Sequence, residues 1–185
     1  MKKIISIMMV WALLLCFSSC AFVAREVETA DYSLINSVYN DLLVEKCNEV
    51  SAKYGEEELD FHPTYTTVDI DGDGVSEIII KTGVKEKEYK YEIYAYEPYE
   101  KAVVLLGEHE GSYSSLHRNA DGGICIIKCH KNIESKYNVK YDGEKLTFET
   151  VYENKKVEHY SADNDSVLVS ATANDNALLD SLIEE

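Results

Sequence analysis

The chain of 185 residues is poor in proline, cysteine and basic residues, and each shortage excludes a class of protein. Two prolines are too few for a proline-rich linker protein. Five cysteines are too few for a disulfide-dense secreted domain. Only 18 Lys and Arg stand against 34 Asp and Glu, which gives a formal net charge of −16. Nucleic acid is therefore not expected as a partner, because phosphate contacts need clustered basic side chains.

Familiar catalytic motifs are missing as well. The sequence has no nucleophile elbow, no phosphate-binding loop and no HExxH motif, and its five histidines are scattered without metal-ligand spacing. Ser114 or Ser115 could approach His117, but a chain this rich in Ser and Asp offers such pairs by chance. We therefore expect a protein that is not an enzyme, with a small hydrolase as the weaker alternative.

The one long apolar run of the sequence lies at the N-terminus, from Ile4 to Phe17, directly after two lysines. This order predicts a signal peptide over residues 1–19, and the run is short for a membrane span. Ser18-Ser19-Cys20 resembles the lipobox of bacterial lipoproteins, in which the cysteine is lipidated and becomes the new N-terminus. The resemblance implies an exported chain held on the outer face of the cell membrane by a lipid on Cys20.

Phe17 stands where lipoproteins prefer an aliphatic residue, so two alternatives stay open. Ser19-Cys20-Ala21 could serve as an ordinary signal-peptidase site that releases a secreted protein, or the apolar run to Ala24 could remain as an anchor. All three readings place the domain outside the cytoplasm. Cleavage removes Lys2 and Lys3, so the net charge changes from −16 to −18. Because anionic lipids repel such a domain, we expect membrane attachment through the N-terminus only.

Residues 20–30 are interpreted as a tether, 31–160 as a single globular domain, and 161–185 as a tail that can end in a short helix. Within the domain, residues 32–54 carry apolar side chains at a period close to 3.6, and Asp31 and Gly55 suit the N-cap and C′ positions. This pattern predicts an amphipathic helix that packs on a sheet. The apolar positions are Leu34, Ile35, Val38, Leu42, Cys47 and Val50.

From Thr64 to Tyr160 the pattern changes to short apolar or alternating runs separated by turn residues, which predicts strands. We expect an α+β fold, mainly antiparallel β, with the N-terminal helix packed on a curled meander sheet, a barrel or a sandwich. A complete propeller needs more strands than fit. The expected strands lie at 64–69, 76–82, 89–96, 102–108, 112–117, 123–129, 136–141 and 145–152.

Two cysteines fall within one of these runs, Gly123 to Cys129. On a strand, Cys125 and Cys129 share a face but stand about 13 Å apart, too far for a disulfide bond. We expect Cys125, Ile127 and Cys129 to pack together into the core.

One segment carries a chemical motif. Residues 69–77 read DIDGDGVSE, which places the carboxylates of Asp69, Asp71, Asp73 and Glu77 at alternating positions of a tight loop. Without a counter-ion these charges repel one another, and a hard divalent cation removes the repulsion. Ca²⁺ takes six to eight oxygen ligands, including a backbone carbonyl at the seventh loop position, here Val75. The spacing therefore predicts a calcium loop, with a plain acidic turn as the alternative.

The loop resembles the D-x-D-G-D-G calcium loops of EF-hands, dockerins and FG-GAP or VCBS repeats. An EF-hand places a bidentate Glu at position 12, which is Ile80 here, and a helix on each side. The β-branched residues that flank this loop match the strand–loop–strand form of FG-GAP repeats better. In that form an acidic residue at position 9, here Glu77, completes the ligand shell. The resemblance leaves open whether the calcium is structural or contacts a bound ligand.

A wider resemblance links the chain to small exported Gram-positive proteins, in which such a hairpin precedes a tyrosine-rich strand. The matching stretches are Val68–Ile80 and Tyr91–Tyr96. We expect an exported calcium-binding module that binds an envelope protein or glycan, with an inhibitor or accessory factor of a secreted enzyme as the alternative. Exposed tyrosines grip partners at low entropic cost, so Tyr89, Tyr91, Tyr94 and Tyr96 form the candidate partner face. Ordinary cross-strand packing is the competing interpretation.

Overall fold

The structure, a computed structural model, describes residues 31–54, 63–158, 166–167 and 171–172. The expected signal peptide (1–19), the tether (20–30) and the expected C-terminal helix (175–185) lie outside these residues. In the described ranges, no helix has the length and apolar character that crossing a membrane requires.

The helix α2 spans Tyr32–Tyr54, the range that the apolar period predicts. Asp31 caps its first turn, because the Leu34 amide donates to Asp31 Oδ1 at 3.2 Å. The buried line of the helix differs from the expected one: it consists of Ile35, Tyr39 and Leu43, each at most 2% exposed. These residues are spaced four apart and therefore stand above one another on one face. Leu34, Val38 and Leu42 are only half-buried beside this line.

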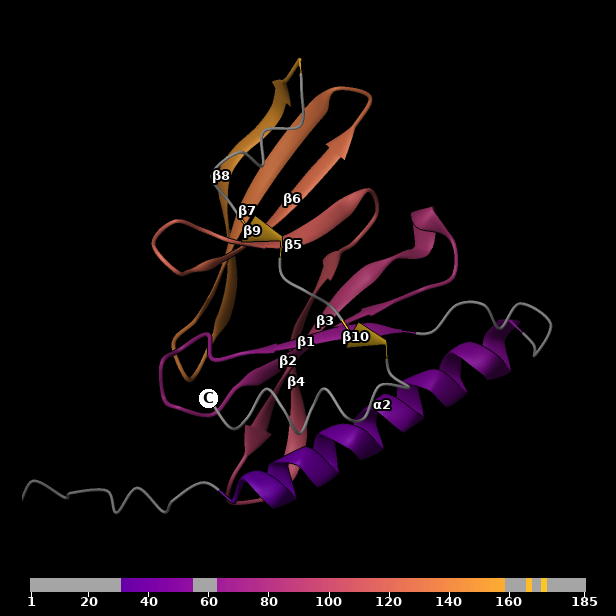
Figure 1. Cartoon of the computed structure of the whole chain (residues 1–185), viewed down its shortest axis with the longest axis vertical. Helices are drawn as coiled ribbons and strands as arrows, with labels where there is room; N and C mark the ends of the chain where they lie inside the picture. The colour runs from indigo at the N-terminus through magenta and orange to yellow at the C-terminus, as the bar shows by residue number, and fades with distance from the viewer. Residues whose placement is uncertain (1–30, 55–62, 159–165, 168–170, 173–185) are drawn as a thin grey trace, which may run out of the picture. The chain divides into compact units, whose positions relative to one another are not determined.

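All eight predicted strands are present, and they form two successive antiparallel meanders. In the first sheet the order is β10-β1-β2-β3-β4, and helix α2 lies along this sheet (Figure 1). Its strands are β1 (Thr64–Val68), β2 (Glu77–Thr82), β3 (Lys90–Glu97), β4 (Ala102–Glu110) and β10 (Ala171–Thr172), with the 3-10 helix η2 (Glu86–Glu88) before β3.

The second sheet has the order β8-β7-β6-β5-β9, and neither sheet closes into a barrel within the described residues. Its strands are β5 (Ser114–Arg118), β6 (Ile124–His130), β7 (Ile133–Tyr141), β8 (Leu146–Lys156) and β9 (Ser166–Val167). The two-residue strands β9 and β10 come from the segment that the sequence presents as a tail. The sequence pattern does not predict these two strands, because a strand of two residues is too short to show a recognisable alternation.

The main apolar cluster draws on both sheets. Four buried side chains come from the first sheet and four from the second, and half-buried residues of the loop, β4 and β8 pack against them. Burial of this kind is the principal favourable term in folding. The buried members are Val68, Ile79, Tyr91, Ile93, Leu116, Ile124, Ile126 and Val139.

Strand β6 corrects one expectation about the core. Cys125 and Ile127 are buried, but the cluster between the sheets uses Ile124 and Ile126, which alternate with them along the strand. Both faces of this half of β6 are thus covered, whereas Cys129 is only half-buried. The described cysteines Cys47, Cys125 and Cys129 are not in disulfide bonds, as the spacing of Cys125 and Cys129 predicts.

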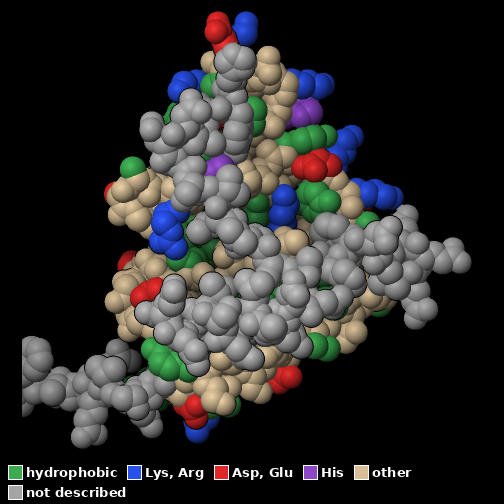
Figure 2. Space-filling view, in the orientation of Figure 1, with side chains coloured by type: hydrophobic (Ala, Val, Ile, Leu, Met, Phe, Trp, Pro, Cys, Tyr) green, Lys and Arg blue, Asp and Glu red, His purple; other side chains and the backbone are tan. Residues whose placement is uncertain are grey.

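Strand β8 forms one edge of the second sheet and carries charged side chains along its exposed half. Glu149, Glu153, Lys155 and Lys156 are all exposed. On the face seen in Figure 2, Lys and Arg side chains gather in the upper part, over the strands of this sheet. Charges on an edge strand discourage pairing with a further strand, so this edge is protected against aggregation.

Candidate metal centre

The acidic segment 69–77 connects two paired strands. β1 and β2 are antiparallel, and their last pair, Val68 with Glu77, closes the loop. The predicted strand–loop–strand form is therefore present. Gly72 and Gly74 have φ angles of 79° and 90°, in the left-handed region that glycine adopts without strain. No atom lies within 4 Å of a Cβ built on either glycine, so these positions favour glycine for its backbone conformation and not for lack of space.

Each aspartate of the loop accepts a backbone hydrogen bond from a residue two or more positions later. Asp69 accepts the amides of Gly72 and Gly74 at 2.7 and 3.0 Å. Asp71 accepts the Asp73 amide at 3.1 Å, and Asp73 accepts the Val75 amide at 2.7 Å. These Asx-type turns curl the backbone around the carboxylates, as short Asp side chains do in tight turns.

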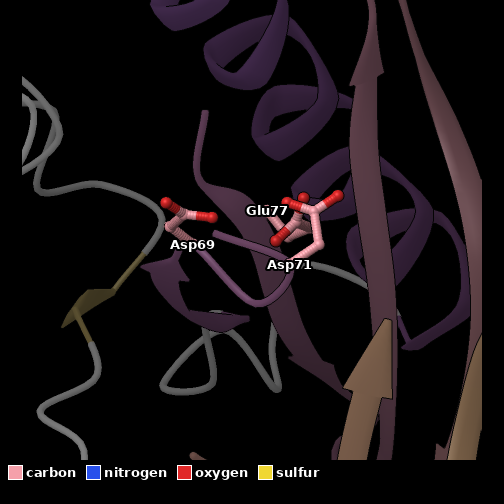
Figure 3. A group of neighbouring side chains, drawn as sticks. All are labelled: Asp69, Asp71 and Glu77. Carbon is pink, nitrogen blue, oxygen red and sulfur yellow. The ribbon is translucent and has the colours of Figure 1, made fainter. Parts of the chain in front are cut away.

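Three of the predicted ligand side chains meet. Asp69, Asp71 and Glu77 each offer an oxygen, and these three oxygens lie within 4.8 Å of one another. In Figure 3 the three side chains arise from the same bend of the chain, with the carboxylates of Asp71 and Glu77 side by side. Asp73 is exposed, accepts the Val75 amide and lies outside this group. Val75 lies half-buried in the same loop.

Glu77 is the buried member of the group, with 3% of its surface exposed. The pKa of its carboxyl is raised from 4.5 to about 7, chiefly by burial, with the hydrogen bond from the Ile70 amide opposing the shift and the charges of Asp71 and Asp73 adding to it. That amide donates to Glu77 Oε2 at 2.7 Å. Burial also raises the pKa of Asp71. A cation among these oxygens would favour the charged forms that burial opposes.

Helix α2 supports the loop from one side. The Tyr39 hydroxyl donates to the Ser76 carbonyl at 2.7 Å, and the Tyr32 hydroxyl donates to the Gly74 carbonyl at 3.1 Å. Burial and then the charge of Glu77 raise the pKa of Tyr39, which keeps its donor proton in place. No sequence motif marks either tyrosine as part of the site, although their spacing of seven residues places them on one helix face.

The second sheet borders the loop from another direction. A Cβ on Gly143, in the turn between β7 and β8, would lie 3.5 Å from Asp71 Oδ2. Burial raises the pKa of Tyr141, and the charges of Asp71, Glu77 and Asp73 add to this shift. An open hollow of about 420 Å³ lies here, with Ile70 of the loop in its lining. The acidic loop of the first sheet therefore lies next to both helix α2 and the turn between β7 and β8.

The candidate partner face of tyrosines is wrong for two of its four members. Tyr91 and Tyr94 are 2% and 6% exposed, and Tyr89 and Tyr96 are half-buried. Tyr91 enters the cluster between the sheets, whereas the Tyr94 hydroxyl donates to Glu92 at 2.6 Å on β3. Residues three apart on a strand point to opposite faces, so these tyrosines cannot form one exposed platform.

The Ser–His pair considered in the sequence does form, but in the interior. Ser115 Oγ and His117 Nε2 lie 2.7 Å apart on β5. His117 has no exposed surface and Ser115 is half-buried. A general base must reach a substrate as well as a nucleophile, so a pair whose histidine has no exposed surface gives the hydrolase alternative no support.

Comparison with known proteins found no matching family, no matching curated protein and no matching solved structure.

Proposed function

We propose that the loop of residues 69–77 binds Ca²⁺. The observation that carries the proposal is the convergence of three carboxylates, one of them the buried Glu77, within 4.8 Å. Leaving a carboxylate buried without a cation is costly, and a bound divalent ion offsets that cost.

The donor set favours calcium over other metals. Every proposed ligand is an oxygen: the side chains of Asp69, Asp71, Asp73 and Glu77, and the carbonyl of Val75. Zinc prefers nitrogen and sulfur, and magnesium keeps several waters and demands a strict octahedron. Asp73 is exposed and lies outside the group, so in this proposal its side chain turns toward the ion to complete the ligand set. The ion would stabilise the β1–β2 hairpin, a structural role.

We further propose that the protein is exported, held on the outer face of the cell membrane by a lipid on Cys20, and acts there as a non-enzymatic binding module for an envelope protein or glycan. The N-terminal sequence and the acidic net charge support this placement. Incorporation of a labelled fatty acid into the wild type but not into Cys20→Ser tests the anchor. Equal labelling of both would contradict it.

A thermal melt of the purified protein tests the calcium site. Calcium at 100 times its Kd stabilises a protein by roughly 2.7 kcal/mol, which raises the Tm of a chain of this size by about 5–10 °C. We expect that rise in millimolar calcium relative to EDTA, and its loss in Asp71→Ala.

Asp121→Ala is the matched control, because Asp121 makes the same kind of turn by accepting the Gly123 amide at 3.0 Å between β5 and β6. This variant should respond to calcium as the wild type does. Equal melting of the wild type in calcium and EDTA would show that the loop is only an acidic turn.

A further inference from the structure

Helix α2 holds the two backbone carbonyls on either side of Val75. Tyr32 binds the Gly74 carbonyl and Tyr39 binds the Ser76 carbonyl, at 3.1 and 2.7 Å. Each hydroxyl comes from a residue far away in the sequence, so these contacts exist only when the helix is docked. Among the hydrogen bonds of the residues that the structure describes, the other donors to this loop are its own amides.

Holding these carbonyls fixes the one between them. Each carbonyl belongs to a rigid peptide plane, and the backbone turns only at the Cα atoms between planes. Fixing the planes that follow Gly74 and Ser76 leaves little freedom for the plane between them, which carries the Val75 carbonyl. This is the carbonyl that the proposed calcium site uses at its seventh position.

The helix in turn depends on the loop. Its fully buried side chains are Ile35, Tyr39 and Leu43, and its ion pair to the sheet, Lys46 with Glu92, lies beyond them toward the C-terminus. The N-terminal half is thus attached by a short apolar line, the half-buried apolar residues beside it and the two tyrosine hydroxyls. A change in the loop backbone therefore acts first on this half.

We propose that Tyr39 and Tyr32 are positioning residues of the calcium loop, so that calcium binding and docking of the N-terminal half of α2 strengthen each other. This inference rests on the proposed function. Its two parts are linked by thermodynamic necessity: if the docked helix raises the affinity for calcium, then calcium stabilises the docked helix by the same factor.

Calcium affinity in tyrosine-to-phenylalanine variants tests the first part. Tyr39→Phe keeps the buried ring and removes only the hydroxyl, and we expect it to weaken calcium binding about threefold to tenfold, the worth of one hydrogen bond. Tyr32→Phe should weaken it less, because Tyr32 is 45% exposed. Isothermal titration with calcium chloride measures both.

Tyr54→Phe is the matched control on the same helix. Its hydroxyl donates to Glu88 at the other end of α2, away from the loop. This variant should bind calcium within a factor of about two of the wild type. Circular dichroism checks that Tyr39→Phe is folded, and if it is not, the exposed Tyr32→Phe provides the comparison with Tyr54→Phe.

Hydrogen exchange tests the second part. In the wild type, calcium should slow exchange of the amides of residues 35–43 more than that of residues 46–54, and Tyr39→Phe should reduce this difference. Calcium binding by the wild type with unchanged affinity in both loop-facing variants would overturn the inference alone. Absence of calcium binding by the wild type would overturn the proposed function and the inference with it.

Discussion

At the scale of single residues, the energetics of the loop centre on Glu77. Its carboxylate is almost fully buried, it accepts one backbone hydrogen bond, and Asp71 stands beside it. Burial raises its pKa to about 7, so in metal-free protein it takes up a proton near neutral pH. The charge of the buried Glu77 carboxylate is costly without a cation, and the same carboxylate is the best placed to bind one.

This shift predicts how metal-free stability depends on pH. The folded state binds the Glu77 proton more tightly than the unfolded state, so stability falls as pH rises from 4.5 toward 7 and stays low above it. Glu77→Gln cannot ionise. In EDTA we therefore expect Glu77→Gln to match the wild type at pH 5 and to exceed it at pH 8, by urea unfolding.

In calcium at pH 8, we expect the wild type to be more stable than Glu77→Gln, because the variant lacks a charged ligand. A wild type that stays as stable as Glu77→Gln in EDTA at both pH values would show that the carboxylate is not strained by burial.

At the scale of elements, the helix and the first sheet are joined by a buried ion pair. Lys46 Nζ lies 3.1 Å from Glu92 Oε2, with the two side chains 12% and 4% exposed. Glu92 also binds Lys90 and the Tyr94 hydroxyl. Burial alone would lower the pKa of Lys46, but its bonds to Glu49, Tyr94 and Glu92 raise it. The pair therefore contributes to the docking of α2.

The exposed pair of Lys140 and Glu149 allows a matched comparison. Their charged atoms are 2.7 Å apart, but the side chains are 57% and 56% exposed. We expect Lys46→Met to lower the free energy of unfolding by about 1–3 kcal/mol, since it leaves a buried carboxylate with one partner fewer. Lys140→Met should change it by about 0.5 kcal/mol or less, because water screens surface pairs. Urea unfolding of both measures this, and equal losses would contradict it.

At the scale of the whole molecule, the two sheets share one apolar cluster. A cluster that draws half of its side chains from each sheet cannot lose one half without exposing the other. The described domain should therefore unfold as one cooperative unit rather than sheet by sheet.

Ile126→Ala tests this cooperativity. Ile126 is fully buried in the cluster, so its truncation should cost about 2–5 kcal/mol. Amide protection should fall in β2 of the first sheet as well as in β6, as hydrogen exchange would measure. Val151→Ala, on the exposed half of β8, is the control and should have little effect. Loss of protection in the second sheet alone would mean that the sheets unfold separately.

The local features of this protein follow from short-range patterns in the amino-acid sequence. The 3.6-residue period located α2, the short runs located eight strands, and the spacing of Asp, Gly and Glu in residues 69–77 located the acidic loop. All of these features depend on residues within a few positions of one another, because residues at that range set local propensity and alternation. The alternation of side chains along a strand also predicts that Tyr91 and Tyr94 lie on opposite faces, because they are three residues apart.

Which distant residues meet depends on how the whole chain packs. The division of the meander into two sheets, the addition of β9 and β10, and the approach of Tyr32, Tyr39 and Gly143 to the loop all join segments far apart in the chain. Such pairings follow from the packing of whole faces, which no short period encodes. Within the loop, the spacing offers four carboxylates, and the folded backbone brings Asp69, Asp71 and Glu77 together while Asp73, which accepts the Val75 amide, stays outside the group.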